Sequence, residues 1–362
     1  MFSFFKKKKQ EPTFKGNVED FWTWFANNAA RFKETIDQGK CADLLDETSS
    51  AISKMIPKIG WCYGPGEGEG RHALTLSPEA DRDHQFLAEY WISRKPEIPD
   101  WDFYPAKKGG DLSESYSINT GGYDFGVDEI WVSTEIDTED EKIVLTAWHH
   151  HFYELEENAR YRVSFILLDE LLGEYDVQNY IYLKEFTTEK LADSIPLMEL
   201  SDFLESVKKE YGWHKPSPCE TYCTYKLPGE EKVFPRSDAF VGSTCHFDLI
   251  RDYFTAKSEL EDPLKGSLAE YVFIRLDNSL LPEGEEVNFR ADIEDKIEAV
   301  LLAEKSGRSF GGSQGSEYAY IDFLLYDGQN SIDLVLQEMK TAGLPGGTTL
   351  HFWARGKEVL KL

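Results

Sequence analysis

The sequence has few cysteines, far fewer basic than acidic residues, and no long apolar run at its start. Five cysteines in 362 residues are too few, and odd in number, for a disulfide framework, so we expect reduced thiols in a cytoplasmic protein. The N-terminal segment MFSFFKKKKQ has no long apolar core. We therefore expect neither a secretion signal nor a stable membrane insertion at this end.

The shortage of basic residues leaves the chain strongly acidic. Its 39 Lys and Arg residues face 66 Asp and Glu residues, which gives a net charge of −27. Such a chain repels the phosphate backbone, so direct binding to DNA or RNA is not expected. An acidic face could instead attract a basic protein partner. Acidity that serves only solubility is the alternative.

The length predicts more than one domain. A chain of 362 residues exceeds what one hydrophobic core usually supports, and 41% hydrophobic residues are ordinary for a globular protein. The proline-containing break HKPSPCE, at 214–220, separates two segments of regular structure. We expect an N-terminal tail at 1–17, an N-terminal α+β domain at 18–215 and a C-terminal domain at 216–362.

Helical and alternating patterns follow one another in the N-terminal domain. Helical spacing of apolar residues predicts helices at 18–38, 41–56, 86–96 and 198–213. An extended pattern predicts a strand at 71–77, and a region rich in extended patterns begins at residue 101. Within that region, 128–137 and 141–153 are predicted to be neighbouring strands. The segment RYRVSFILLD, at 160–169, fits either a buried strand or the first half of a buried helix.

The C-terminal domain alternates strands and helices. The predicted order is a strand at 269–277, a helix at 291–307, a strand at 317–327, a helix at 330–344 and a strand at 348–355. This order suggests a ferredoxin-like sandwich. The expected fold class is therefore α+β, with two domains that each have a mainly antiparallel sheet and helices packed on one face.

The segment GGSQG, at 311–315, matches the G-x-S-x-G pattern of a nucleophilic serine. That chemistry needs a strand before the turn and a helix after it, whereas here a predicted helix precedes and a predicted strand follows. The end of a helix also repels phosphate. We therefore expect a flexible or partner-contacting loop, with Gly312, Ser313 and Gly315 as candidate binding residues.

Two sets of residues could in principle hold a metal ion. His149 and His151 are predicted on one side of a strand, where they could bind metal or titrate near neutral pH. The other set consists of Cys219, Cys223, Cys245 and His246. Cys245 and His246 are adjacent, so a strand would point their side chains to opposite faces and they could not both bind one ion. This favours cysteines that are simply packed in the core. A structural role is also favoured for the two histidines, which stay candidate binding residues, and neither a metal nor a cofactor is expected.

The segment RVSFILLDELLGEYDVQNYI, at 162–181, runs from apolar residues into a cluster of carboxylates. If its first half is a strand, Asp169 lies at the strand end and caps the helix that follows. Glu170 and Glu174 are four residues apart and would share one exposed helical face. A structural role is favoured for each carboxylate, and a docking surface is the alternative.

Four segments carry a resemblance to a bacterial family. They are WDFYPAKKG at 101–109, DFGVDEIWVS at 124–133, IVLTAWHHHFYEL at 143–155 and LLDELLGEYDVQNYI at 167–181. In order and spacing they resemble domain of unknown function 695, over residues 18–210. The family offers no catalytic residues to transfer, so the resemblance implies only a family-typical surface at Asp169, Glu170 and Glu174. The family's usual His-Pro after the strand is replaced here by HHHF.

The second region, at 289–327, resembles the ferredoxin-like regulators of ribonuclease E, which implies inhibition by protein contact. Our leading hypothesis is a non-enzymatic cytoplasmic protein whose acidic surface restrains a basic partner such as a nuclease or toxin. The alternative is an enzyme or small-ligand binder with a site between the domains, where His149, His151 and the 311–315 segment are the first candidates. A third hypothesis is a membrane-peripheral adaptor that uses residues 1–10.

Overall fold

The computed structural model describes most of the chain. The described residues are 11–110, 112, 116–229, 233–282, 284–344 and 346–361. Residues 1–10, most of the expected N-terminal tail, lie outside them. Helices and strands both contribute, and most strand pairs are antiparallel, so the α+β class is confirmed. None of the helices in the described part is long and apolar enough to span a membrane.

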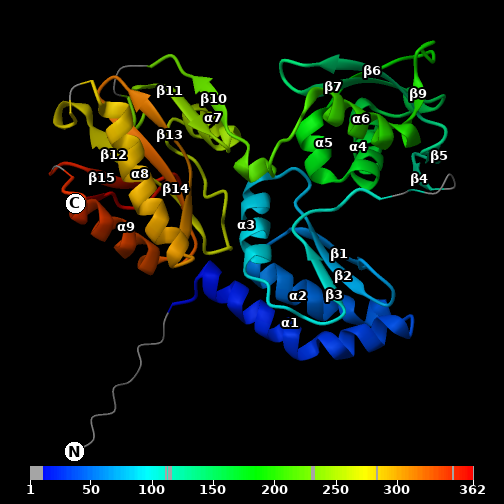
Figure 1. The fold of residues 1–362 in the computed structure, drawn as a ribbon, viewed down its shortest axis with the longest axis horizontal. Helices are drawn as coiled ribbons and strands as arrows, with labels where there is room; N and C mark the ends of the chain where they lie inside the picture. Colours follow the sequence, from blue (N-terminus) through cyan, green and yellow to red (C-terminus); the bar gives the residue numbers. More distant parts are fainter. Residues whose placement is uncertain are drawn as a thin grey trace, which may run out of the picture. The chain divides into compact units, whose positions relative to one another are not determined.

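Internal contacts divide the chain into two compact units, which we call unit 1 and unit 2 (Figure 1). Unit 1 consists of Met1–Ile59, Ser93–Ile98 and Cys219–Leu362. Unit 2 consists of Gly60–Ile92 and Pro99–Pro218. Each unit has its own sheets and helices, and each is described separately.

Unit 2 begins with a three-stranded sheet. Its strands are β1 (Gly60–Pro65), β2 (His72–Ser77) and β3 (Trp101–Tyr104), in the order β1-β2-β3. β2 and β3 pair parallel, which requires a crossover, and α3 (Arg82–Ser93) lies in that connection. The predicted strand and helix at β2 and α3 are confirmed. β1 was not predicted, because glycine and proline are uncommon in strands.

The rest of unit 2 packs helices on a second sheet. Its strands are β6 (Trp131–Asp137), β7 (Lys142–Trp148), β8 (Ile181–Phe186) and β9 (Ile195–Pro196), in the order β8-β7-β6-β9. Alternate residues of β7 are buried, as expected for a sheet with one covered face. The helices are α4 (Glu157–Leu172), α5 (Glu174–Tyr180) and α6 (Leu200–Tyr211), with short 3-10 turns η2 (Phe152–Glu154) and η3 (Leu197–Glu199). A hairpin of β4 (Ser117–Thr120) and β5 (Tyr123–Gly126) adds to the unit. The predicted neighbouring strands are confirmed as β6 and β7.

Unit 1 includes two helices from the start of the described chain. They are α1 (Phe14–Asp37) and α2 (Leu45–Met55), joined by the 3-10 turn η1 (Cys41–Leu44). The predicted helices are thus confirmed, although α1 begins earlier. The hydroxyl of Thr13 caps α1 by accepting from the backbone N–H of Gly16. The ring of Phe14 then packs on Tyr326, which fixes the first turn of α1 on the rest of unit 1.

A seven-stranded antiparallel sheet forms the body of unit 1. Its strands are β10 (Cys223–Lys226), β11 (Ala239–Thr244), β12 (Glu270–Asp277), β13 (Gly307–Gly315), β14 (Tyr318–Leu325), β15 (Thr349–Phe352) and β16 (Leu360–Lys361). The spatial order is β10-β11-β13-β14-β12-β15-β16. The helices are α7 (Phe247–Thr255), α8 (Glu286–Ala303) and α9 (Gln329–Thr341), with 3-10 turns η4 (Pro218–Glu220) and η5 (Asn278–Leu280). The predicted elements at β12, α8, β14, α9 and β15 are confirmed. α8 and α9 lie side by side over one face of the sheet (Figure 1).

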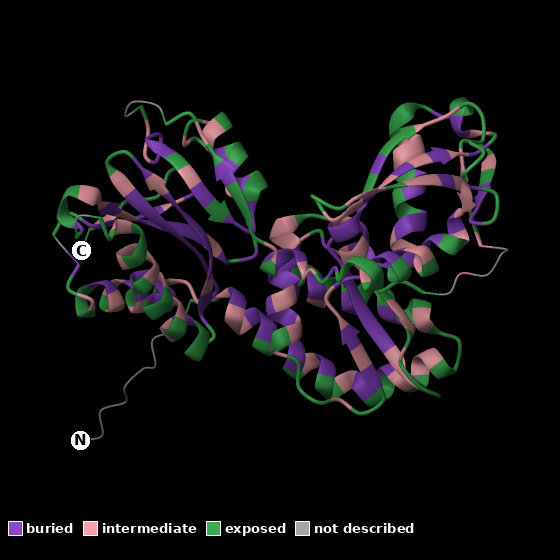
Figure 2. Ribbon diagram, turned by 45° about the horizontal axis from the view of Figure 1, so that its top comes forward, coloured by how far each residue is buried: buried purple, intermediate pink, exposed green. Residues whose placement is uncertain are grey.

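Both faces of this sheet are covered, so its central strands are buried along most of their length (Figure 2). Val272, Ile274 and Leu276 of β12 pack into the core formed with α8 and α9. Phe273, between them, points to the other face, where its ring packs on Trp353. Strands buried on both faces read as continuous apolar runs, which is why they could be predicted.

Three local predictions need correction. Residues 160–169 lie in α4, so the strand alternative is wrong and Asp169 caps no helix. The segment GGSQG is the end of β13, paired with β11 and β14, and not a loop. A side chain at Gly312 would collide with the backbone of β14 and with Arg290, so close packing and not turn formation explains this glycine. His149 and His151 follow β7 instead of lying on it.

Candidate functional site

Unit 2 contains a pocket of about 690 Å³ between α4, α5, the turn after β2 and the segment after β3. Its lining residues are Ser77, Glu79, Ala80, Lys107, Arg162, Phe165, Ile166, Asp169, Glu174, Val177, Gln178 and Ile181. The volume falls in the range of small-molecule sites. Asp169 and Glu174, two of the three carboxylates singled out in the sequence, therefore meet in one concave site.

Two helical faces form the main walls. α4 contributes Arg162, Phe165, Ile166 and Asp169, which are spaced three or four residues apart and so lie along one face of the helix. From Glu174, α5 continues with residues at the same spacing, Val177 and Gln178, followed by Ile181 at the start of β8. The pocket is thus lined by one continuous stripe from each of the two helices.

Gly173 separates α4 from α5 and sets the angle between these walls. Its φ of +87° is a conformation that L side chains rarely adopt. A Cβ added there would lie 2.7 Å from the backbone nitrogen of Gly109, and Lys108 forms a β-bridge with Gly173. The break therefore disproves the prediction that Glu170 and Glu174 share one helical face.

The loop 107–110 is fixed to the same break by backbone hydrogen bonds. The N–H of Glu174 donates to the carbonyl of Lys107 at 3.1 Å, and the N–H of Gly110 donates to the carbonyl of Glu170 at 3.0 Å. The first bond joins WDFYPAKKG to LLDELLGEYDVQNYI, two of the segments that carry the family resemblance, and the second adds the residue that follows WDFYPAKKG. They also hold the Lys107 side chain at the pocket wall.

Glu174 is only 3% exposed, although glutamate is seldom buried without a partner. The hydroxyl of Ser77 donates a hydrogen bond to Oε1. No donor among the described residues makes a hydrogen bond to Oε2. Burial raises the pKa of Glu174, while the Ser77 hydroxyl, the nearby charge of Lys107 and the backbone N–H of Glu79 oppose that rise.

Asp169 has the more strongly shifted titration. Burial, followed by the charge of Glu174, raises the pKa of Asp169 from its ordinary 3.8 to about 7. Lys107 opposes the shift. An acid with this pKa is partly protonated at neutral pH, so it can accept or donate a proton there.

The positive groups of the pocket are placed differently. The ammonium of Lys107 forms an ion pair with Glu170 at 2.8 Å, so much of its charge is offset inside the wall. Arg162 lies one turn before Phe165 on α4 and is exposed. Phe165 and Ile166 are 38% and 37% exposed, whereas Glu174 is buried. The pocket therefore combines an inner carboxyl pair with an apolar outer wall.

The histidine candidates lie elsewhere in unit 2. His149 is 1% exposed, has its ring centroid 4.7 Å from that of Phe125 at a tilt of 45°, and has its Nε2 3.7 Å from the Glu129 carboxylate. Burial, followed by the charge of His150, lowers the pKa of His149 to about 4. The ring of His151 packs at 4.4 Å on Tyr123. These contacts support the structural role favoured for both histidines.

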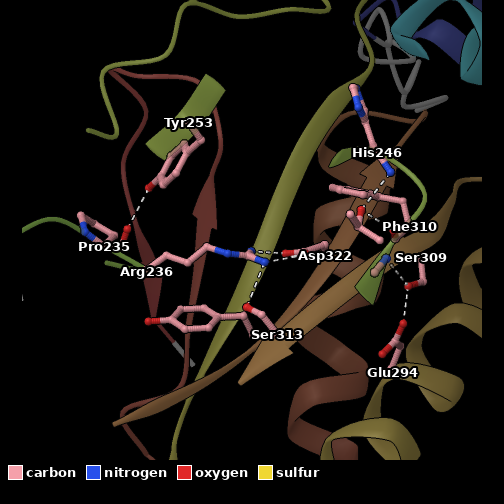
Figure 3. Close-up of polar contacts among 12 residues, drawn as sticks. Pro235, Arg236, His246, Tyr253, Glu294, Ser309, Phe310, Ser313 and Asp322 are labelled. Atoms are coloured by element: carbon pink, nitrogen blue, oxygen red, sulfur yellow. Dashed lines mark hydrogen bonds and ion pairs between the residues drawn. The ribbon is translucent and has the colours of Figure 1, made fainter. Parts of the chain in front are cut away.

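Gly312, Ser313 and Gly315 lie on β13 in unit 1, where Ser313 lies beside a buried ion pair (Figure 3). Arg236 donates to both carboxylate oxygens of Asp322 and, at 3.1 Å, to the hydroxyl of Ser313. Ser313 is 2% exposed. A buried hydroxyl that accepts from a guanidinium is not placed to attack a substrate, so these residues support the sheet and not a catalytic turn.

The cysteine and histidine set takes part in separate local contacts. No group of three or more His, Cys, Asp or Glu side chains that could hold a metal ion occurs in the described ranges. His246 instead begins α7, where its Nδ1 accepts from the backbone N–H of Leu249 at 3.3 Å. Cys219 and Cys245 are buried, whereas Cys223 is exposed on β10.

Several pocket residues were missed by the sequence analysis. Ser77, Lys107 and Arg162 come from a strand end, a loop and a helix that are distant in the chain. Arg162 and Asp169 could have been placed on one wall by the helical spacing of the segment, had its first half been recognised as a helix. No local signal identifies Ser77, because its role depends on a carboxylate 97 residues later.

Comparisons with known proteins add no relative. A scan against protein-family models found no match to this chain, and searches of characterised proteins and of solved structures found none either.

Proposed function

We propose that the protein binds a small ligand in the pocket of unit 2 and that Asp169 and Glu174 recognise it. The observation that supports this function best is Glu174, whose carboxylate is buried at the pocket with one oxygen that accepts from no described donor. A buried charge without full hydrogen bonding is costly, and a ligand that donates to it recovers part of that cost. The titration of Asp169 near neutral pH supports a functional site in the same place.

A fragment screen by protein NMR tests this function. Ile166→Trp fills the pocket from its half-exposed wall, and Leu302→Trp makes the same kind of change on α8 of unit 1, where Leu302 is 56% exposed. We expect fragments to bind the parent protein and Leu302→Trp, and to lose binding in Ile166→Trp. Fragments that bind equally well to Ile166→Trp, or no binding fragment at all, would contradict a ligand site here.

We also propose, as a second function, the binding of a basic protein partner. The support is the net charge of −27 together with an acidic turn between β6 and β7. Glu139 and Asp140 are exposed there, and the Asp137 side chain fixes the turn by accepting from both of their backbone N–H groups at 3.0 and 3.1 Å. Exposed charges of this kind attract a partner in a salt-dependent way.

A pull-down with stepwise salt elution tests this second function. Glu139→Lys combined with Asp140→Lys reverses the turn, and Asp333→Lys is the control on an exposed site of α9. We expect the parent protein and the Asp333→Lys control to retain a stoichiometric basic protein that is released at moderate salt. The variant with the reversed turn should not retain it. Retention by the reversed turn would remove it from the interface.

We further propose that the two units are separate domains. We also propose that β12 to β15, with the helices between them, form a ferredoxin-like sandwich, and that the chain is related to domain of unknown function 695. The support for the sandwich is the succession β12-α8-β13-β14-α9-β15 with the strand order β13-β14-β12-β15. The support for the family is the contact between WDFYPAKKG and LLDELLGEYDVQNYI at Gly109 and Gly173. An experimental structure that pairs these strands differently would refute the sandwich.

A further inference from the structure

The inner part of the pocket is negative. Asp169 and Glu174 both line it, and the charge of Glu174 raises the pKa of Asp169, so the two carboxyl groups oppose each other's ionisation. The nearest cation, Lys107, is paired with Glu170 at 2.8 Å. A ligand that brings a positive charge and hydrogen-bond donors to this point would satisfy both carboxylates.

The outer part is apolar along α4, and apolar side chains also line the opposite wall. Phe165 and Ile166 of α4 face the pocket with more than a third of their surface exposed, and Val177 and Ile181 line it from the other side. Exposed apolar side chains that rim a concave site bind apolar groups through the hydrophobic effect. The pocket therefore offers a negative inner end and an apolar outer wall to a single ligand.

We propose that the pocket binds the ammonium end of an alkylamine, with the ammonium at Asp169 and Glu174 and the alkyl chain along Phe165 and Ile166. This proposal rests on the proposed small-ligand function and names its ligand class. An ammonium carries three donors on one compact charge, so it can donate to the carboxyl groups of Asp169 and Glu174, which line the same pocket. A lysine side chain of another protein presents the same chemistry as a free amine.

The same arrangement argues against other ligand classes. A bare metal ion would need more ligands than the described residues bring together. A carboxylate or phosphate ligand would be repelled by the carboxyl pair. A second positive charge at the far end of the ligand would meet exposed Arg162, so the ligand has one cationic end only.

Binding of a cation also changes the protonation of Asp169. A positive charge beside this carboxyl lowers its pKa, so a proton that the empty pocket holds at neutral pH is released. The ionisable groups that act on Asp169 or line the pocket with it are Glu79, Lys107, Arg162, Glu170 and Glu174. We expect the release of about half a proton per ligand near pH 7.

The experiment compares three unbranched six-carbon probes with different head groups. Hexylamine, hexanoate and 1-hexanol are titrated into the full-length protein by NMR, and hexylamine also by calorimetry in two buffers of different ionisation enthalpy. We expect hexylamine to bind at least about tenfold tighter than either of the other two, because only its head group brings a positive charge to the two carboxyl groups. Calorimetry reports the proton release.

Two pocket variants and one control complete the test. Glu174→Gln and Asp169→Asn should each weaken hexylamine binding by about tenfold, because each removes one of the two charges at the head group. Glu210→Gln, on the exposed side of α6, makes the same change of charge away from the pocket and should bind hexylamine like the parent. Asp169→Asn is the safer variant, because Asp169 is less buried than Glu174 and accepts none of the described hydrogen bonds that fix the turn after β2.

The outcomes separate the two proposals. If hexanoate or hexanol binds in the pocket as tightly as hexylamine, the alkylamine class is wrong and the small-ligand function stands. If no probe and no fragment binds, both fail. A short acetylated and amidated peptide with one central lysine distinguishes the sources of the amine: tighter binding than hexylamine assigns the pocket to a protein side chain, and weaker binding assigns it to a free amine.

Discussion

Asp169→Asn should make unit 2 more stable at alkaline pH and leave its stability unchanged at acid pH. Burial and the charge of Glu174 raise the pKa of Asp169 to about 7, above the ordinary 3.8 that it regains when the chain unfolds. Between these values the folded state holds a proton that the unfolded state has lost. The free energy of unfolding therefore falls as the pH rises through this range, and it stays low above it.

The size of the effect follows from the two pKa values. The difference of about 3 pH units corresponds to about 4 kcal/mol, at about 1.4 kcal/mol per unit. Asp169 is only partly buried, so solvent screening reduces this figure, and we take about 2 kcal/mol as the expected gain. Asparagine keeps the shape of the side chain and removes its charge, so the gain should equal the penalty that ionised Asp169 imposes.

Urea unfolding at several pH values, followed by circular dichroism, measures this gain. At about pH 8 the variant should be more stable by about 2 kcal/mol, and the difference should disappear near pH 4. Glu210→Gln, an exposed carboxylate of the same unit, is the control and should show no such pH dependence. A gain that is equal at all pH values, or a loss at pH 8, would refute the account of Asp169.

The remaining predictions concern stability in both units. Arg236→Met should destabilise unit 1 by about 3–5 kcal/mol, because it leaves Asp322 buried without its cation, and adding Asp322→Leu should restore most of the loss in urea unfolding. Gly173→Ala should lower the free energy of unfolding by about 2–4 kcal/mol in thermal unfolding, because both its φ of +87° and the adjacent backbone oppose a Cβ. Gly212 has a φ of +69° but open space around it, so Gly212→Ala, the control, should lower it by only about 1 kcal/mol. Burial lowers the pKa of His149 to about 4, so as the pH falls from about 6.5 to 4 the unfolded state binds a proton before the folded state does, and the parent protein loses stability. His149→Phe should remove this loss, which acid titration followed by fluorescence would detect.

Helices and strands with complete periodic patterns could be predicted from the sequence. α1, α8 and α9 keep apolar residues at helical spacing over three or more turns, and β6 and β7 alternate along their length. β13 could not be predicted in this way, because GGSQG reads locally as a loop. Its pairing with β11 and β14 is a tertiary effect, and tertiary context outweighs local propensity in strands.

The carboxylates of the site could be named from the sequence, but their arrangement could not. Asp169, Glu170 and Glu174 were identified as a cluster, but Asp169 was placed at a strand end, and Glu170 and Glu174 were placed on one exposed face of an unbroken helix. Gly173 is the reason for the error, since its positive φ turns α5 away from the axis of α4 and carries Glu174 inward. Ser77 and Lys107 come from distant segments, so no spacing rule connects them to the cluster.

The cost of this arrangement supports its link with a ligand. Glu174 is only 3% exposed, so folding removes the water around its carboxylate, and one described side chain donates a hydrogen bond to it. Asp169 lies in surroundings that make its ionisation unfavourable at neutral pH. Replacing Asp169 by an uncharged side chain should stabilise the folded chain at alkaline pH, so packing alone does not explain this carboxyl group. Groups that reduce the stability of the fold are typical of binding sites when they lie in a concave site, because a bound ligand replaces the hydrogen bonds to water that these groups lost on folding. The same two carboxyl groups therefore link the stability prediction to the binding prediction: Asp169→Asn should gain stability at alkaline pH and lose affinity for hexylamine in one substitution.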